Sequence, residues 1–285
     1  MPEAGLSDWR ADKVPPLPRL GQHFLLSPAT LQRIAQSALP IDKAIVCDIG
    51  AGTGLLSHRL LMEGAYHVVA VENDPRCLLS LQRLKTCAGE RMTIYSEDIL
   101  KVDVCQRIRH RHGPSKPIKI VANIPYHLSA PLFGLWLDGW RDYAGITVTA
   151  QKEVVCRLAA TTGRNYGRLS VAVQRLFEVT PLFKIKRTAF TPPPQVESQV
   201  VRLIPRDKPQ VCLDAGILDH VLRAAFGKRR KMLKSALKDL VAEKEALEKL
   251  LVATGIDGTK RAQDIAAQDF YRLARTYESW EAANR

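Results

Sequence analysis

The chain has 285 residues, and its 42 lysines and arginines against 29 aspartates and glutamates give a formal net charge of +13. This excess favours a polyanionic partner such as nucleic acid. No apolar run approaches the roughly 20 residues that a membrane-spanning helix needs, so we expect no membrane partner. The six cysteines form no CxxC pair and show no regular spacing, which argues against a metal site or a disulfide framework and indicates a reduced, cytoplasmic setting.

Residues 1–19 are predicted to form a flexible lead-in outside the folded core. They lack the apolar stretch of a secretion signal, and their acids balance their bases, unlike an import signal. The proline-rich stretch VPPLPRL at 14–20 favours an extended backbone. We therefore expect the first domain to begin at residue 20.

From residue 44, short apolar runs alternate with amphipathic ones, which predicts an α/β fold with a parallel sheet and crossover helices. The expected strands are 44–49, 67–72, 92–95, 118–122 and 146–150, and the expected helices are 55–62, 76–85 and 131–137. Two further β-rich runs, 180–186 and 198–204, are expected to close the sheet as a hairpin pair. This first domain would span residues 20–206.

After residue 206 the composition changes to helix formers and charged residues, with apolar side chains three and four positions apart. Residues 207–285 are therefore predicted to form a small helical domain, whose size is typical of a separate unit.

A glycine turn lies between the first expected strand and its helix, with Gly50, Gly52 and Gly54 in the stretch DIGAGTG. Glycines let the backbone turn sharply and let a ligand approach closely. Leu55 stands where the dinucleotide fingerprint requires its third glycine, which argues against NAD. The turn suits a nucleoside cofactor such as S-adenosylmethionine, although a plain strand-to-helix turn remains an alternative for this motif alone.

Two acids follow the next two strands. Glu72 stands 22 residues after Gly50, close to the offset at which an acid reaches ribose hydroxyls. Asp98 is placed to accept a hydrogen bond from an adenine amino group. Since the carboxyl ends of parallel strands share one edge of a sheet, these acids and the glycine turn are expected to line one ligand site.

The stretch NIPY follows the fourth strand, at the same edge. If the substrate is a nucleobase amine, the Asn123 side-chain oxygen and the Ile124 carbonyl can accept its two N–H groups and localise its lone pair for attack on a methyl sulfonium. Pro125 would fix this turn, and Tyr126 would stack on the base, an interaction worth about 1–3 kcal/mol. Alone, these residues favour an ordinary turn; beside a cofactor edge, they favour a substrate site.

A basic cluster, Lys228, Arg229, Arg230 and Lys231, lies in the helical region within GKRRKMLK. Such a run is often only a solvated helix face. In a chain of net charge +13 we expect it to bind RNA phosphates.

The ordered set LGQHFL (20–25), DIGAGTG, VEND, EDIL, NIPYHLSAPL and FTPPPQVESQVVRL (190–203) resembles the KsgA-type small-subunit ribosomal RNA adenine N6,N6-dimethyltransferases over nearly the whole chain after residue 19. The resemblance implies a Rossmann-like, S-adenosylmethionine-dependent methyltransferase domain with a small C-terminal helical RNA-binding domain. It implies dimethylation of N6 of two adjacent adenines near the 3′ end of 16S rRNA, within immature 30S particles, by a monomer that needs no metal.

The resemblance also assigns site residues. Positions that contact the cofactor in the family correspond to His23, Leu25, Gly50, Gly52, Glu72, Asp98 and Asn123, and those that shape the adenine pocket correspond to Asn123, Tyr126 and Phe190. Two positions depart from the family pattern: position 23 is usually Asn, and Ala51 replaces a proline of the glycine turn. The His23 contact could therefore come from its side chain or its backbone.

Two other functions stay open. One is methylation of large-subunit rRNA adenine by an enzyme of the antibiotic-resistance type, which shares the NIPY-type motif. The other is a ribosome-assembly factor without catalysis, which the glycine turn, Glu72 and Asn123 oppose.

Overall fold

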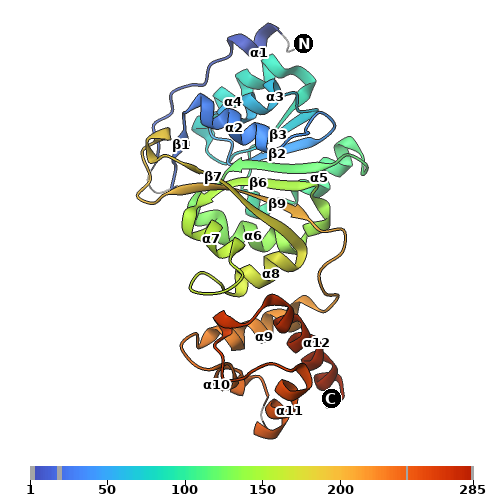
Figure 1. Ribbon diagram of the computed structural model, residues 1–285. Coiled ribbons are helices and arrows are strands. Elements are labelled where there is room, and N and C mark those ends of the chain that lie inside the picture. Colours follow the sequence, from blue (N-terminus) through green and yellow to red (C-terminus); the bar gives the residue numbers. More distant parts are fainter. Residues whose placement is uncertain (1–3, 18–20, 242, 284–285) are drawn as a thin grey trace. The chain divides into compact units, whose positions relative to one another are not determined.

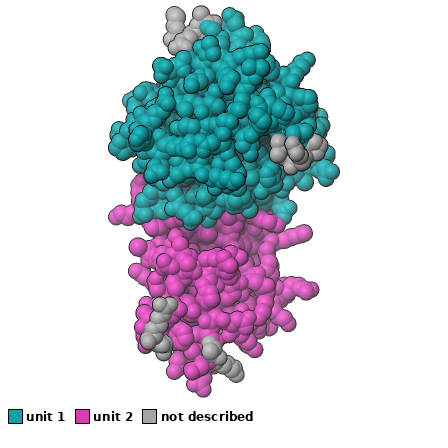
Figure 2. All heavy atoms as spheres, turned by 180° about the vertical axis from the view of Figure 1, so that it is seen from behind, with its two compact units in different colours: residues 1–155, 178–205 teal, residues 156–177, 206–285 magenta. Residues whose placement is uncertain are grey.

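The structure is a computed structural model that describes residues 4–17, 21–241 and 243–283 (Figure 1). It divides into two compact units, coloured separately in Figure 2: residues 1–155 with 178–205, and residues 156–177 with 206–285. The third point of division, between residues 205 and 206, lies one residue before the domain boundary expected at 206/207. Residues 156–177, which the composition placed in the first domain, pack with the C-terminal helices instead.

One seven-stranded sheet runs through the described part of the first unit in the order β4-β3-β2-β5-β6-β9-β7 (Figure 1). Its strands are β2 (Ile45–Ile49), β3 (His67–Val71), β4 (Met92–Tyr95), β5 (Ile118–Asn123), β6 (Gly145–Gln151), β7 (Phe177–Ile185) and β9 (Ser198–Pro205). Strands β2 to β6 pair in parallel and β9 pairs antiparallel to β6. The predicted parallel sheet and its closing β-rich pair are confirmed.

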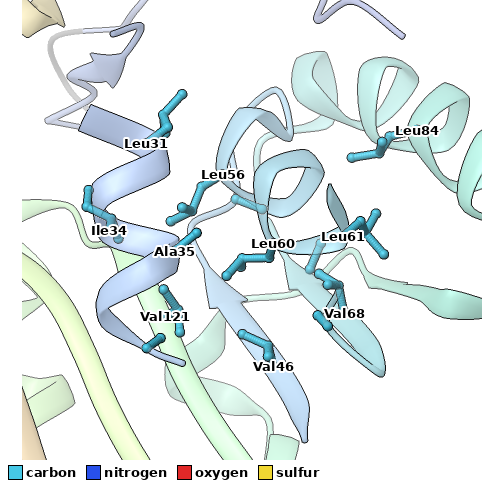
Figure 3. Packing of buried hydrophobic residues seen from close by; sticks show 14 of the residues in the cluster. Leu31, Ile34, Ala35, Val46, Leu56, Leu60, Leu61, Val68, Leu84 and Val121 are labelled. Atoms are coloured by element: carbon cyan, nitrogen blue, oxygen red, sulfur yellow. The ribbon is translucent and has the colours of Figure 1, made fainter. Parts of the chain in front are cut away.

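The helices of this unit are α1 (Ala4–Asp8), α2 (Pro28–Ser37), α3 (Leu55–Met62), α4 (Pro75–Ala88), α5 (Val104–His112), α6 (Ser129–Asp138) and α7 (Lys152–Ala159), the last of which crosses into the second unit. Local chemistry sets where two of them begin. Ser27 caps α2 and Asp74 caps α4, and in both a proline occupies the first turn. Figure 3 shows Ala35 of α2 beside Leu56 of α3, and Leu60 of α3 above Val46 of β2. All four belong to one buried core cluster, which holds α3, the helix after the glycine turn, on the sheet.

The lead-in prediction is corrected for residues 4–17. Leu6 is 0% exposed and Trp9 is 6% exposed, and both belong to the core of the first unit. Leu6 in α1 and Trp9 just after it are three positions apart, so their side chains lie on the same side of the chain. Burying a tryptophan removes a large apolar surface from water. Residues 1–3 and 18–19 of the lead-in lie outside the described residues.

The second unit contains α8 (Arg168–Leu176), α9 (Ala215–Gly227), α10 (Leu233–Ala236), α11 (Lys244–Thr254) and α12 (Ala267–Ala283). Their apolar faces form a separate core that includes Tyr166 and Val171 from the earlier segment. The Tyr271 hydroxyl donates to the Val171 carbonyl at 2.9 Å, which joins α12 to α8. Across the described residues, every helix is too short or too polar to span a membrane.

Candidate functional site

The glycine turn has a backbone that only glycine adopts easily. Gly50, Gly52 and Gly54 have φ values of 67°, 55° and 91°. A Cβ atom on Gly50 would lie 3.2 Å from Pro125 Cδ, and one on Gly52 would lie 3.1 Å from a ring carbon of Phe24. The missing side chains therefore let the glycine turn lie directly against the NIPY turn, as the shared sheet edge predicts.

Glu72 is anchored beside this turn by the backbone. Its Oε2 accepts a hydrogen bond from Gly52 N at 2.7 Å, and its Oε1 accepts one from Asp74 N at 2.8 Å. Burial raises the pKa of the Glu72 carboxyl above its usual value, against the effect of these hydrogen bonds. Each oxygen keeps a lone pair for a further donor, which suits a carboxylate that binds ribose hydroxyls.

Asp48 is a second buried acid, located in β2 below the turn. Its Oδ2 accepts a hydrogen bond from the Ser57 hydroxyl at 2.7 Å. Burial raises the pKa of Asp48 to about 7, and the nearby Glu72 charge adds to the rise. The sequence patterns did not single out this residue, because an acid inside an apolar strand carries no signal of its surroundings.

Asn123 ends β5, and its amide is oriented by a backbone contact. Its Nδ2 donates to the His23 carbonyl at 3.2 Å. His23 directly precedes β1 (Phe24–Leu25), which pairs antiparallel with β8 (Phe190–Thr191). Because the nitrogen is engaged, the Oδ1 oxygen is the end left to accept from a substrate amine.

Tyr126 is held from two sides. Its hydroxyl is hydrogen-bonded to Ser198 Oγ at the start of β9, and its ring stacks on the His23 ring with centroids 5.7 Å apart. Burial raises the pKa of the tyrosine, so the ring is a neutral phenol. The His23 Nδ1 atom lies 2.7 Å from the Pro192 carbonyl oxygen. The His23 side chain is thus engaged with the loop that follows Phe190.

These groups surround a cavity of about 200 Å³. The predicted site residues that line it are His23, Gly50, Gly52, Glu72, Asp98, Asn123, Tyr126 and Phe190. Leu25 does not line it: its side chain is 4% exposed, belongs to the core and borders a smaller neighbouring cavity. Phe190 is only 2% exposed, so it serves as a wall of the cavity.

Sequence reasoning missed several residues of the lining, among them Asn73, Ile99 and Leu100. Each stands within two positions of a predicted acid at a strand end, and that proximity was the available signal. Asp98 accepts from Leu100 N at 3.0 Å and so caps the short turn that carries both apolar side chains.

The charge of the lining favours a cationic ligand. Glu72 and Asp98 contribute carboxylates, Glu97 contributes one that is paired with Arg107, and the described lining residues include no lysine or arginine. A sulfonium or ammonium group is attracted to such a site, whereas a pyrophosphate is repelled.

The basic cluster of the second unit is partly engaged within the protein. Lys228 Nζ pairs with Asp239 at 2.6 Å. Arg229 donates to the carbonyls of Arg164 and Tyr166, each at 2.8 Å, and so fastens the α9–α10 turn to the loop before α8. The cluster's other two residues, Arg230 and Lys231, are exposed.

The family model described as ribosomal RNA adenine dimethylase matches residues 17–279. The chain belongs to the ribosomal RNA adenine dimethylase family. A "Ribosomal RNA small subunit methyltransferase A" of Chelativorans sp. (strain BNC1) is 40% identical over 260 residues, which cover 90% of this chain and 91% of the relative. The protein of the same name from Bradyrhizobium sp. (strain ORS 278) is 42% identical, covering 90% and 88%.

Solved structures agree with membership of the ribosomal RNA adenine dimethylase family. A dimethyladenosine transferase from Plasmodium falciparum has a TM-score of 0.77 and 26% identity, with 90% of this chain and 98% of that chain covered. The 23S rRNA methyltransferase ErmE has a TM-score of 0.68 and 23% identity, with 90% and 99% covered, and shows the fold alone. The predicted Rossmann-like fold, the rRNA adenine dimethyltransferase class and the S-adenosylmethionine cofactor are confirmed.

Proposed function

We propose that this dimethylase transfers methyl groups to N6 of two adjacent adenines near the 3′ end of 16S rRNA, in immature 30S particles. The observation that carries this proposal is the Asn123 amide, whose nitrogen is engaged by His23 and whose oxygen is left beside the cavity. The names of the 40–42% identical relatives support the small subunit as the substrate. From this substrate we infer a cytoplasmic location.

When bound, S-adenosylmethionine supplies a methyl group on a sulfonium. Asn123 Oδ1 and the Ile124 carbonyl accept the two N–H groups of the adenine amine, which makes the nitrogen more tetrahedral and localises its lone pair. The N–C bond then forms as the C–S bond breaks, and the methylated nitrogen loses its proton to water. The product keeps one N–H group, so the same acceptors can orient it for the second transfer.

The aromatic walls select an unstacked base. Tyr126 is fixed by Ser198 and His23, and Phe190 is fixed in the core, so both rings are ordered before the adenine arrives. A pre-ordered ring loses little entropy on binding, which favours stacking on a flipped base. Arg230 and Lys231 are the exposed members of the basic cluster, and we assign phosphate contact to them first.

The test is methylation of immature 30S particles with labelled cofactor, followed by mapping of the modified bases. Asn123→Ala should abolish transfer while leaving RNA binding within about twofold, because the amide acts on the amine and carries no charge. The exposed Asn165→Ala is the matched control and should transfer normally. Turnover by Asn123→Ala comparable to the wild type would contradict the proposed role of the amide.

Large-subunit methylation is the second candidate, because the NIPY-type motif is shared with enzymes of the antibiotic-resistance type. The same assay on separate 30S and 50S precursors discriminates the two, and product in the large subunit alone would overturn our choice. Failure to bind S-adenosylmethionine would instead indicate an assembly factor.

A further inference from the structure

Residues 4–17, called the N-terminal segment below, begin with α1, which lies next to α4 (Figure 1). His58 of α3 holds the start of this segment: its Nε2 lies 2.8 Å from the Leu6 carbonyl oxygen, and its ring lies 4.9 Å from that of Trp9. A Cβ atom on Gly54 would lie 3.7 Å from the Trp9 ring. The segment therefore packs against the end of the glycine turn.

A relay of two hydrogen bonds also connects the segment to this turn. Asp12 N donates to Ser80 Oγ at 3.1 Å, and Ser80 Oγ donates to the Thr53 carbonyl at 2.7 Å. Ser80 is 0% exposed, so water cannot readily replace its hydroxyl. Thr53 stands between Gly52, which donates to Glu72, and Gly54.

A second link reaches the loop that carries Glu72. Arg76 donates to the Pro15 carbonyl at 2.8 Å and pairs with Asp74 at 2.6 Å. Gln22 donates to the same carboxylate at 2.7 Å. Asp74 N in turn donates to Glu72 Oε1, so three successive contacts, through Arg76 and Asp74, connect the segment to the acid that lines the cavity.

We propose that the N-terminal segment is a positioning element of the S-adenosylmethionine site, which holds the glycine turn and the Glu72 loop in their binding geometry. Loosening either link lowers cofactor affinity, whereas RNA affinity stays unchanged because the linked residues are not among those assigned to phosphate contact. The proposal rests on the assigned cofactor and does not depend on which adenine is methylated.

The full-length Ser80→Ala variant tests the relay. We expect its dissociation constant for S-adenosylmethionine, measured by titration calorimetry, to rise about fivefold, and its KM for the cofactor to rise while the KM for RNA does not. Thr86→Ala is the control, since among the residues that the structure describes the Thr86 hydroxyl donates only to the Gln82 carbonyl of the same helix. A cofactor affinity unchanged in Ser80→Ala, with the protein folded, would overturn the proposal. Failure of the wild-type protein to methylate 30S particles, although it binds S-adenosylmethionine, would count against the proposed function instead.

A disulfide tests whether the docked segment is the binding-competent state. A Cβ atom on Gly5 would lie 3.6 Å from Cys87 Cβ, which is within the range of disulfides. Oxidised Gly5→Cys should bind S-adenosylmethionine within about twofold of its reduced form. A loss of affinity of about tenfold or more on oxidation, absent when Cys87→Ser is added, would show that the segment must detach for binding and would refute the proposal.

Discussion

Replacing Ser198 by alanine tests how the substrate ring is positioned. Ser198 is 0% exposed and its hydroxyl bonds to that of the half-buried Tyr126. A net hydrogen bond of this kind contributes about 1 kcal/mol, so Ser198→Ala should lower kcat/KM for methylation about fivefold. Tyr126→Phe should cost a similar amount, and in that background Ser198→Ala should change little. The expected coupling energy is therefore about 1 kcal/mol.

The assay is initial-rate methylation of 30S particles by the two single variants and the double variant. Ser129→Ala is a matched control three residues from Tyr126, because the buried Ser129 hydroxyl has no hydrogen-bond partner within the described chain. Removing that hydroxyl should leave kcat/KM unchanged. Effects of Ser198→Ala and Tyr126→Phe that add to within about 0.3 kcal/mol would refute the idea that Ser198 acts through the tyrosine.

Three further predictions concern charged groups. The pKa of buried Asp48 is raised to about 7 from an unfolded value near 3.8, so its contribution to stability is full below about pH 4 and is lost as pH rises through 7. In Asp48→Asn, the free energy of unfolding measured with urea should therefore lose on the order of 4 kcal/mol of its dependence on pH. Identical pH profiles for the variant and the wild type would contradict this. Burial raises the pKa of Glu72 above its usual value of 4.5, so the carboxylate that binds the cofactor is protonated at a higher pH than a free glutamate. Calorimetry should therefore show that cofactor affinity already falls above pH 4.5 on acidification, and that Glu72→Gln makes this fall smaller. Replacing both Arg230 and Lys231 by alanine should reduce the salt dependence of RNA binding by the amount expected for about two phosphate contacts. Arg229→Ala should mainly lower the free energy of unfolding, by about 1–3 kcal/mol. An unchanged salt dependence in the double variant would show that the cluster is only a solvated surface.

The position of the cavity at one edge of the sheet could be predicted from the sequence, because its polar residues stand at the ends of strands. Glu72, Asp98 and Asn123 each follow a recognisable apolar run, and parallel pairing brings such ends together whatever the loops do. Periodicity also placed α3 at its observed bounds.

Contacts between distant residues were beyond that reasoning. The two-residue pairing of Leu25 with Phe190 has no periodicity to detect, and the hydroxyl contact of Tyr126 joins residues 72 positions apart. Amphipathic helices carry the same signal whichever core they join, so residues 156–177 could not be assigned to the second unit from their pattern. The short helix α1 was not predicted, because the prolines that follow it favour an extended backbone.

The chain passes between the two units three times, at 155/156, 177/178 and 205/206, and this affects how the protein can be made and cut. A fragment ending at residue 206 would carry Tyr166 and Val171 without the residues of α9 to α12 that form most of the second core. Conversely, a fragment starting at 207 would lack the carbonyls that Arg229 binds and the one that Tyr271 binds. During synthesis the apolar side chains of residues 156–177 therefore cannot be buried in the second core until α9 and α12 have left the ribosome. Neither half is an independent module, so experiments that separate RNA binding from catalysis require point variants of the whole chain.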